Sequence, residues 1–562
     1  MSLPVLTNLG RRTSDHTSRR EVRVARASTQ SDAARMPDLP DDLHRHVMIL
    51  EESERQVRIY VNEREKMSAP FLSWQRSVEH AGFVCLVEPV TVARLQQLRQ
   101  LRPNQTRDED GGKDMLQRAS RLFVLAGTAG ISDVTVVQGE HDTCVIVRLD
   151  DRLWVAEGET GEYSMFADDG TRFTRAIYNG LATNKKAEDA TYDPRAFQYA
   201  QIPGDALPGA GLQNVRILRG PSDPIDAGGG FLAARLQPRP GATQSLSRKA
   251  AISALRLRRM PLPQGVFAIN GLLPEQIEKL KVLAGKPHGM IIHTGPTGSG
   301  KTTTMFKAME YIARTYPDRR QITIENPIEY SAEWAIQLLA GTLSFAELLA
   351  KTLRMDPDVL MLSEMRDAEE AWAALQAALT GHLVFTTTHV KDPYRVFQRL
   401  EDMDPVRLSR RTICDHEQIV GVVGQSLLPL LCPHCRQRLS DVSDDVVPTH
   451  VIKSLRTWGD LDQVHVEGAG CDECDGTGHM GRRALAQILV TDEEFMEDIR
   501  TLSVAEAKRR HRSRPDTEPS LTAQAVALVL AGKVSPLDAQ VKVELLPCDG
   551  EVLPPLPGVA AS

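Results

Sequence analysis

Short apolar runs alternate with longer amphipathic stretches between about residues 260 and 430. The runs are rich in β-branched side chains, which suits strands of a parallel sheet that is buried on both faces. The stretches between them have the length and polarity of helices. We therefore expect a doubly wound α/β domain, with strands at 290–294, 321–325, 359–363 and 383–387 and helices at 303–314, 345–354 and 369–379.

A second pattern precedes this domain, in residues 113–236. A helical stretch at 114–126 is followed by short β-type runs at 134–137 and 144–147. This grouping is typical of an α+β domain. The stretch 237–259, which contains prolines, arginines and serines, predicts a linker.

Both ends of the chain are less regular. Residues 1–40 carry arginines scattered among polar residues and predict a disordered basic arm, for which a solvated tail is favoured over a contact with anionic lipid or a partner. Residues 41–112 mix helical and strand signals and form a divergent region without an assigned role. We expect a cysteine-containing subdomain with C-terminal helices at 431–545 and a tail at 546–562.

Composition narrows the classes of function. The length of 562 residues predicts about three or four domains. The net charge of −7, and basic residues that form no track interleaved with aromatic ones, argue against a nucleic-acid-binding protein. No apolar run reaches the ~18 residues of a spanning helix, and the N-terminus has no apolar signal core. We therefore expect a cytoplasmic protein that meets a membrane only indirectly.

One segment carries a specific chemical signal. It fits the phosphate-loop pattern G-x-x-x-x-G-K-[ST] and lies between a predicted strand and a predicted helix. Its glycines permit a tight turn that directs backbone N–H groups at phosphate oxygens, whereas a glycine-rich turn without a ligand is the weaker interpretation. Lys301 would reach the β- and γ-phosphates, and Thr302 would ligate Mg²⁺. The predicted nucleotide contacts are Gly295, Pro296, Thr297, Gly298, Ser299, Gly300, Lys301, Thr302 and Thr303.

Two acidic clusters lie at predicted strand ends: 325–330 follows the strand that starts at Gln321, and 356–367 contains a strand that Glu364 ends. Nucleotide hydrolysis needs carboxylates there, to organise Mg²⁺ and to orient or deprotonate water. Either cluster alone is weak evidence, but together with the phosphate loop they indicate a hydrolase. His382 and His389 bracket the next strand, at opposite ends, so they cannot share one metal ion. For His389, a phosphate sensor and an ordinary histidine at a strand end both remain open.

Four of the eight cysteines form two Cys-x-x-Cys pairs. Four thiolates suit a tetrahedral Zn²⁺ with no open position, and such a site is structural because metal binding stabilises a small subdomain. A redox pair is the weaker alternative, since one Cys-x-x-Cys motif would suffice for it. The predicted zinc ligands are Cys432, Cys435, Cys471 and Cys474.

Jointly, these motifs resemble those of the type II secretion and type IV pilus assembly ATPases, over roughly residues 113–540. The resemblance implies a RecA-like phosphate-loop ATPase core at 260–430, an α+β, PAS-like domain at 113–236 and a small zinc-binding C-terminal subdomain. It implies that Glu329 is the general base or water-orienting residue and Glu364 the Walker-B acid. It also implies that His382 and His389 couple nucleotide state to domain movement.

The resemblance extends to arginines of the 113–236 domain. Arg216 and Arg235 match positions whose side chains contact nucleotide from across an interdomain or intersubunit cleft. A guanidinium group suits this role because it binds phosphate oxygens through two hydrogen bonds. The pattern is incomplete here, since Asp151 stands where the family has Gly and Ile146 where a first Arg is usual.

The resemblance therefore implies a homohexameric cytoplasmic ATPase, peripheral at the inner membrane. It would use ATP, Mg²⁺ and Zn²⁺ and power type IV pilus assembly or type II secretion through an inner-membrane platform protein. The tetracysteine region favours assembly over retraction. A retraction or conjugation-type ATPase remains an alternative, as does a ring scaffold that binds ATP with little hydrolysis. The scaffold is suggested by Asn326, where the family usually has Asp, and Ser363, where it has Gly.

Overall fold

The computed structural model forms two compact units, Met1–Thr106 and Arg107–Ser562. Within them the structure describes residues 37, 39–40, 43, 46–53, 56–62, 65–91, 110–183, 185, 191–241, 246–341, 343–515 and 517–554. Most of the predicted basic arm, 1–40, lies outside these residues, as do 555–562 of the predicted tail. Among the described residues, no helix combines the length and the apolar character needed to cross a membrane.

The described residues of the first unit include a small sheet and a helix, in the region that the sequence left unassigned. Strand β1 pairs antiparallel with β2, and β2 pairs parallel with β3. The helix packs on one face, where Phe71, Trp74 and Val78 join alternate residues of β2 in a buried cluster. The element bounds are β1 Val47–Ser53, β2 Gln56–Asn62, α1 Ala69–His80 and β3 Val84–Val90.

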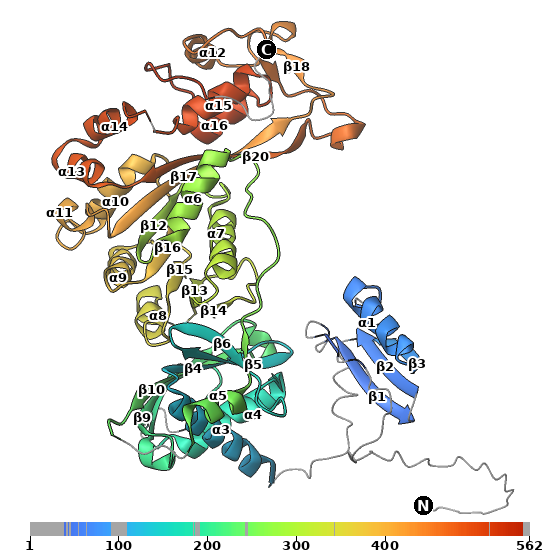
Figure 1. Ribbon diagram of the computed structural model, residues 1–562. Helices are drawn as coiled ribbons and strands as arrows, with labels where there is room; N and C mark the ends of the chain where they lie inside the picture. The colour runs from blue at the N-terminus through green and yellow to red at the C-terminus, as the bar shows by residue number, and fades with distance from the viewer. Residues whose placement is uncertain are drawn as a thin grey trace, which may run out of the picture. The chain divides into compact units, whose positions relative to one another are not determined.

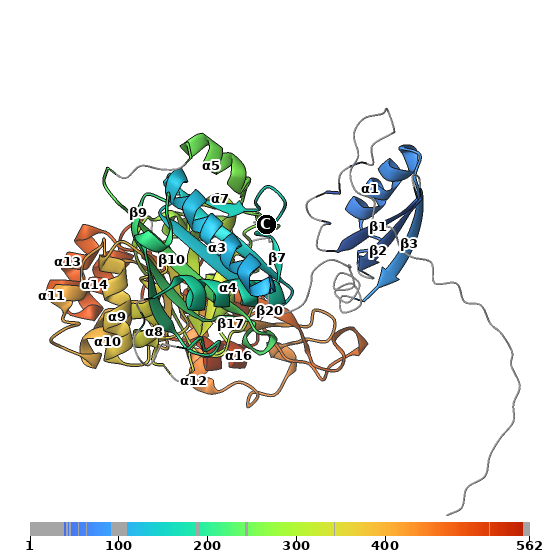
Figure 2. The same cartoon turned by 90° about the horizontal axis from the view of Figure 1, so that it is seen from below.

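The second unit begins with an α+β domain built on an eight-stranded sheet of order β11-β6-β5-β4-β10-β9-β8, with β7 paired to β5. Helices α3, α4 and α5 cover one face (Figure 2). The other face contributes Leu218, Phe231 and Ala233 to the core of the following domain. The bounds are α3 Asp110–Ala129, β4 Asp133–Gln138, β5 Asp142–Leu149, β6 Arg152–Ala156, β7 Met165–Phe166, α4 Ala167–Ala176, a π-helical turn Ile177–Leu181, β8 Gln198–Pro203, β9 Leu212–Pro221, β10 Gly230–Pro238, α5 Arg248–Leu255 and β11 Leu257–Arg259.

The stretch 237–259, predicted as a linker, is largely part of this domain. Helix α5 starts at Ser247, whose hydroxyl accepts a hydrogen bond from the N–H of Ala250. Ala251, Ala254 and Leu255 are buried in the domain core, and β11 pairs antiparallel with β6. The short apolar face of this helix was not evident in the sequence among the prolines and arginines of the stretch.

The next domain is a seven-stranded sheet of order β14-β13-β15-β16-β12-β17-β20 (Figure 1). Its first six strands pair in parallel. Helices α6 and α7 cover one face, and α8, α9 and α10 cover the other. The bounds are α6 Pro274–Gly285, β12 Gly289–Thr294, α7 Lys301–Thr315, β13 Gln321–Glu325, β14 Ala335–Leu339, α8 Phe345–Thr352, β15 Val359–Leu362, α9 Ala368–Leu379, β16 Leu383–Thr388, α10 Val396–Met403, α11 Arg410–Ile413 and β17 Ile419–Leu431.

The seventh strand comes from the C-terminal region. Strand β20 pairs antiparallel with β17 from Gly421 opposite Val490 to Leu431 opposite His479. The cysteine region is therefore an insertion between two strands of one sheet. Its bounds, and those of the helices that follow, are β18 Gln437–Arg438, α12 Thr449–Arg456, β19 His465–Val466, β20 His479–Val490, α13 Glu493–Thr501, α14 Val504–Arg512, α15 Leu521–Leu530 and α16 Pro536–Val543.

Candidate nucleotide and metal sites

The phosphate-loop segment connects the end of β12 to the start of α7. Gly295, Gly298 and Gly300 have φ values of 142°, 74° and 86°, which side chains rarely adopt. A Cβ atom on Gly295 would lie 2.2 Å from the main-chain oxygen of Gln425. The loop thus needs glycine at its first position both for its conformation and for its close approach to β17.

Lys301 lies inside the curve of this loop and is 7% exposed. Its Nζ donates hydrogen bonds to the carbonyl oxygens of Gly295, at 2.9 Å, and Pro296, at 3.1 Å. Burial lowers the pKa of Lys301, and the nearby carboxylates of Glu364 and Glu329 oppose this shift. The ammonium group is held where phosphate oxygens would meet the loop, with two acidic side chains close enough to act on its charge.

A buried glutamine supports the loop from below. The side-chain oxygen of Gln425 accepts a hydrogen bond from the Thr304 hydroxyl, and its nitrogen donates to the Ser299 carbonyl, both at 2.9 Å. Gln425 is 2% exposed. No sequence pattern pointed to this residue, because it belongs to β17, more than a hundred positions away from the loop.

Glu364 follows β15 and stands between two basic side chains. His389 Nε2 lies 2.9 Å from one carboxylate oxygen, and Arg366 Nε donates to the other at 3.1 Å. Strands β15 and β16 are joined at this end, since the Thr387 hydroxyl donates to the Ser363 carbonyl at 2.7 Å. The structure therefore brings His389 to Glu364, and through β15, β16 and β12 to the edge of the sheet that carries the phosphate loop.

His382 lies at the other end of β16. Its Nδ1 is 2.9 Å from the carbonyl oxygen of Ala377 and 3.2 Å from the Thr380 hydroxyl. These contacts fix the turn between α9 and β16. The two histidines are separated by the full strand, as the sequence predicted, and only His389 contacts an acidic side chain of the candidate site.

The acidic segment after β13 contains one buried and one exposed glutamate. Glu325 is 2% exposed, accepts a hydrogen bond from the Thr323 hydroxyl at 2.7 Å, and has its pKa raised by burial. Glu329 is exposed, and its charge acts on Lys301. Tyr330 closes the segment with a 2.8 Å hydrogen bond between its hydroxyl and that of Thr303 in α7. Glu325 was not among the predicted site residues.

A histidine is buried on β12, immediately before the loop. His293 is fully buried, and neither of its ring nitrogens has a hydrogen-bond partner in the described part of the chain. Its ring lies 6.3 Å from that of Phe385, centroid to centroid. Burial, aided by the charge of Lys301, lowers its pKa to about 3. A neutral imidazole thus forms part of the apolar layer beneath α7.

Arg216 and Arg235 lie opposite each other on β9 and β10. Both are exposed, and Arg235 Nη1 is 3.9 Å from Asp356 Oδ1. Asp356 precedes the start of β15, so this contact is at the amino-terminal edge of the parallel sheet, whereas the phosphate loop follows the carboxyl end of β12. Within one chain, the two arginines are therefore placed a strand length away from the loop.

The same edge holds a buried ionic network between the α+β domain and the core. Arg148 pairs with Asp356 and, at 2.7 Å, with Asp358. Arg320 Nη1 donates to the Met355 carbonyl at 2.8 Å. Asp133 faces this cluster, and burial and the charge of Asp356 raise its pKa. The network ties the sheet of the α+β domain to the residues that lead into β15.

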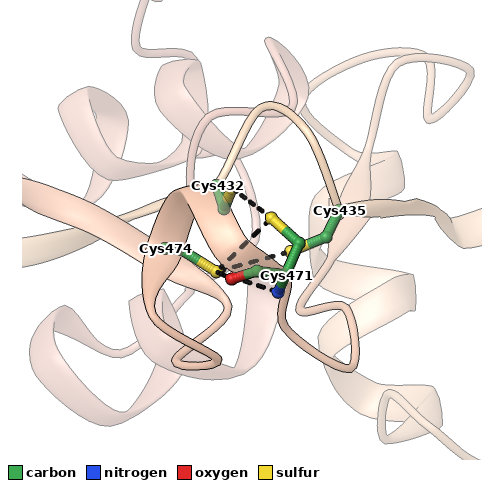
Figure 3. A group of neighbouring side chains, drawn as sticks. All are labelled: Cys432, Cys435, Cys471 and Cys474. Atoms are coloured by element: carbon green, nitrogen blue, oxygen red, sulfur yellow. Dashed lines mark hydrogen bonds between the residues drawn. The ribbon is translucent and has the colours of Figure 1, made fainter.

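The four predicted zinc ligands converge at the end of the β17–β20 ribbon (Figure 3). The Sγ distances are 3.7 Å for Cys432–Cys471, 3.9 Å for Cys435–Cys474 and 3.8 Å for Cys471–Cys474. Four sulfurs at about 2.3 Å from a tetrahedral Zn²⁺ lie about 3.8 Å apart. The spacing is far too long for disulfide bonds. The donor set and its geometry therefore fit a closed metal site.

Backbone N–H groups complete this cluster. Those of Cys471 and Gly478 point at Cys474 Sγ, at 3.3 and 3.2 Å. Such donors stabilise a thiolate, which is the form that binds metal. His434 and His479 are not part of the converging group, and His479 instead pairs with Asp538 at 2.9 Å.

Comparison with known proteins gives a consistent set of relatives. The model of the family described as "Type II/IV secretion system protein" matches residues 248–542. The type IV pilus assembly ATPase PilB of Thermus thermophilus is 34% identical over 329 residues, which are 54% of this chain and 33% of that protein. Type II secretion system protein E of Klebsiella pneumoniae is 36% identical over 228 residues, 40% of this chain and 42% of that protein. The chain thus spans less than half the length of these two relatives.

Two solved structures of ATPases also match part of this chain. The pilus retraction motor PilT with bound ADP matches 73% of this chain and 93% of its own, with 22% identity and a TM-score of 0.35. The VirB11 ATPase of the Brucella suis type IV secretion system matches 56% of this chain and 91% of its own, with 20% identity and a TM-score of 0.36.

Proposed function

We propose that this chain, which belongs to the type II/IV secretion system protein family, binds and hydrolyses ATP as the motor of a pilus-assembly or secretion machine. The main support for this proposal is the Glu364–His389 pair, which lies at the edge of the sheet where the phosphate loop encloses Lys301. Relatives named as a pilus assembly ATPase and as secretion proteins support the machine-level part of the proposal.

In this proposal the loop glycines and Lys301 hold the β- and γ-phosphates. Thr302, the first hydroxyl residue of α7, would hold Mg²⁺, which neutralises charge on the phosphates when bound. Glu329 is the base or water-orienting residue, since its carboxylate is exposed and acts on Lys301. Glu364, held by His389 and Arg366, is the Walker-B acid, which would help to organise Mg²⁺.

The scaffold alternative rests on Asn326. The residue is exposed next to Glu325 and carries no charge, so the acidic segment has one carboxylate fewer than the family pattern expects. Ser363 adds a buried hydroxyl that has no hydrogen-bond partner among the described residues. Both changes would slow turnover more than binding, because Lys301 and the loop are independent of them.

The assembly and partners belong to the same proposal. A homohexameric ring would place the exposed Arg216 and Arg235 of one subunit toward a neighbour, where they could contact its nucleotide. We place the protein in the cytoplasm, attached to the inner membrane through a platform protein. The names of the relatives favour assembly and secretion, while a retraction or conjugation-type motor remains the alternative.

Nucleic acid is not part of the proposed function. The basic run Lys508–Arg514 is the strongest local positive charge near the C-terminus, yet its side chains are paired within the chain. Lys508 contacts Asp392 at 2.7 Å, and Arg510 contacts Asp498 at 2.6 Å. These pairs hold α14 against neighbouring elements instead of presenting a basic surface.

Phosphate release by purified protein tests the proposal. We expect ATP hydrolysis in the wild type, about a hundredfold slower hydrolysis in Glu364→Gln, and loss of nucleotide binding in Lys301→Ala. A wild-type rate equal to that of Glu364→Gln, with ATP binding retained, would instead support the ring scaffold. Six-fold rings in negative-stain images with a slowly hydrolysed ATP analogue would support the assembly state, and monomers would contradict it.

A further inference from the structure

The loop that carries Glu329 is held by one buried side chain. Gln337, on the edge strand β14, is 5% exposed. Its Oε1 accepts a hydrogen bond from the N–H of Ala332 at 2.7 Å, and its Nε2 donates to the Tyr330 carbonyl at 2.9 Å. One amide group therefore fixes both the carbonyl and the N–H that flank Ser331.

The same amide nitrogen reaches the beginning of the loop. Gln337 Nε2 donates a second hydrogen bond to Glu325 Oε1 at 3.1 Å. The backbone N–H of Glu329 also acts on the Glu325 carboxylate and opposes the rise of its pKa. Gln337 thus joins the start of the loop, the residue after Glu329 and the end of the loop in one buried network.

Strand β14 itself is anchored on its outer side. The main-chain oxygen of Gln337 accepts a hydrogen bond from the N–H of Asp223 at 2.8 Å, in the turn between β9 and β10 of the α+β domain. On its inner side β14 pairs with β13 in parallel, with Gln337 opposite Thr323. The side chain that fixes the loop therefore starts from a backbone held on both sides.

We propose that Gln337 is a positioning residue: it holds Glu329, the proposed base, in place and does not itself contact the nucleotide. This inference rests on the proposed hydrolysis. Its role differs from that of Gln425, which holds Ser299 and Thr304 and so supports the phosphate loop. Two buried glutamines of one sheet thus have separate tasks, one for the group that activates water and one for the loop that binds phosphate.

The first test replaces each glutamine by methionine, which keeps the length and removes the amide. Gln337→Met should lower kcat about tenfold, which corresponds to the free energy of one lost buried hydrogen bond. The dissociation constant of a non-hydrolysable ATP analogue should stay within about twofold of the wild-type value. Gln425→Met should instead weaken that binding. Gln524→Met is the matched control, because Gln524 is also buried but its amide donates to the carbonyl oxygens of Ala486 and Pro519 and to neither loop. A kcat for Gln337→Met equal to that of Gln524→Met would overturn the inference.

A charged variant adds a signature that general destabilisation would not give. In Gln337→Glu the new carboxylate would meet Glu325, so both N–H donations are lost and like charges face each other. When the new carboxyl group is protonated, its O–H can again donate. Relative to wild type, kcat of Gln337→Glu should therefore rise as pH falls from 8 to about 6. A ratio that is independent of pH would contradict the proposed role.

Trp334 gives a readout that does not need hydrolysis. Its ring lies 5.2 Å from that of Phe306 in α7, centroid to centroid, and it sits between the loop and β14. Gln337→Met should increase acrylamide quenching of Trp334, measured as the difference from a Trp334→Phe background, whereas Gln524→Met should not. Unchanged quenching would overturn the inference even if the wild type proved to be a non-hydrolysing scaffold.

Discussion

At the scale of single residues, the site is defined by polar side chains whose burial is unusual. His293, Lys301, Glu325 and Gln425 are each less than about a tenth exposed. The polar atoms of three of them make hydrogen bonds at the two loops of the site. His293 makes no such bond, so its burial should lower the stability of the folded protein.

The buried histidine should make the protein sensitive to mild acid. The pKa of His293 is about 3 in the folded chain, below the ordinary value of 6.5 that the unfolded chain keeps. Below pH 6.5 the unfolded state binds the proton and the folded state does not, so the folded state becomes less stable as the pH is lowered. His293→Val should remove about 1.4 kcal/mol of the stability lost between pH 7.5 and 5.5. Urea unfolding at the two pH values measures this, and an identical loss in the variant would contradict it.

Gly295 should be intolerant of any side chain. In Gly295→Ala the Cβ atom would clash with the main chain of Gln425, and the φ of 142° is strained for alanine. We expect nucleotide binding at least tenfold weaker, measured by titration with a fluorescent ATP analogue. Gly298→Ala is the comparison, because its Cβ atom would meet no atom within 4 Å and it shares only the positive φ. Equal losses in both variants would show that conformation alone, not the clash, matters.

At the scale of elements, β17 and β20 connect the two candidate sites. Gln425 supports the phosphate loop in the middle of β17, and Cys432 follows the end of the same strand. The paired strands make the cysteine insertion a continuation of the core sheet. Metal binding should therefore stabilise the far end of this ribbon and the helices packed on it.

The cysteine cluster should hold one metal ion per chain. Metal analysis of the purified wild type should give about one Zn²⁺, and Cys471→Ser should lose it and lower the thermal midpoint by several degrees. Cys548→Ser is the control, because Cys548 lies outside the converging group. If the wild type contained no zinc, the zinc prediction would be wrong and the two Cys-x-x-Cys pairs would be interpreted as redox pairs.

Among the elements, those with a strong local pattern were predicted and those defined by pairing were not. The strands β12, β13, β15 and β16 lie within one residue of their predicted bounds, since each is a short apolar run. Strand β14 was missed, because a short edge strand has little pattern of its own. Helix α5 was predicted as linker, since only its contact with α3 reveals its apolar face.

At the scale of the molecule, the α+β domain and the core of the second unit share both apolar and ionic contacts. Leu218, Phe231 and Ala233 belong to the same buried cluster as α8 and α9. Arg148 adds the ionic network with Asp356 and Asp358. The two domains should therefore unfold together, although each is built on a sheet of its own.

Breaking that network should uncouple the domains. Arg148→Ala leaves the half-buried Asp356 and Asp358 without their main partner and should cost about 2 kcal/mol, less than the loss of one member of a fully buried pair. Arg239→Ala is the matched control, because its pair with Asp205 is exposed and should matter by less than about 1 kcal/mol. In calorimetry, these two domains should share one transition in the wild type and separate into two in Arg148→Ala. A single, unshifted transition would contradict the coupling.

The sequence by itself determined the phosphate loop, the two acidic segments, the cysteine pairs and the parallel strands between them. Each of these is a local pattern, in which neighbouring residues carry the whole signal. Only the tertiary structure decided which side chains hold these segments in place. Gln425 bonds to a residue 126 positions away, Gln337 closes a loop from an edge strand, and β20 returns to the core sheet after the cysteine insertion. Such partners are selected by the pairing of strands, which no single stretch of sequence contains.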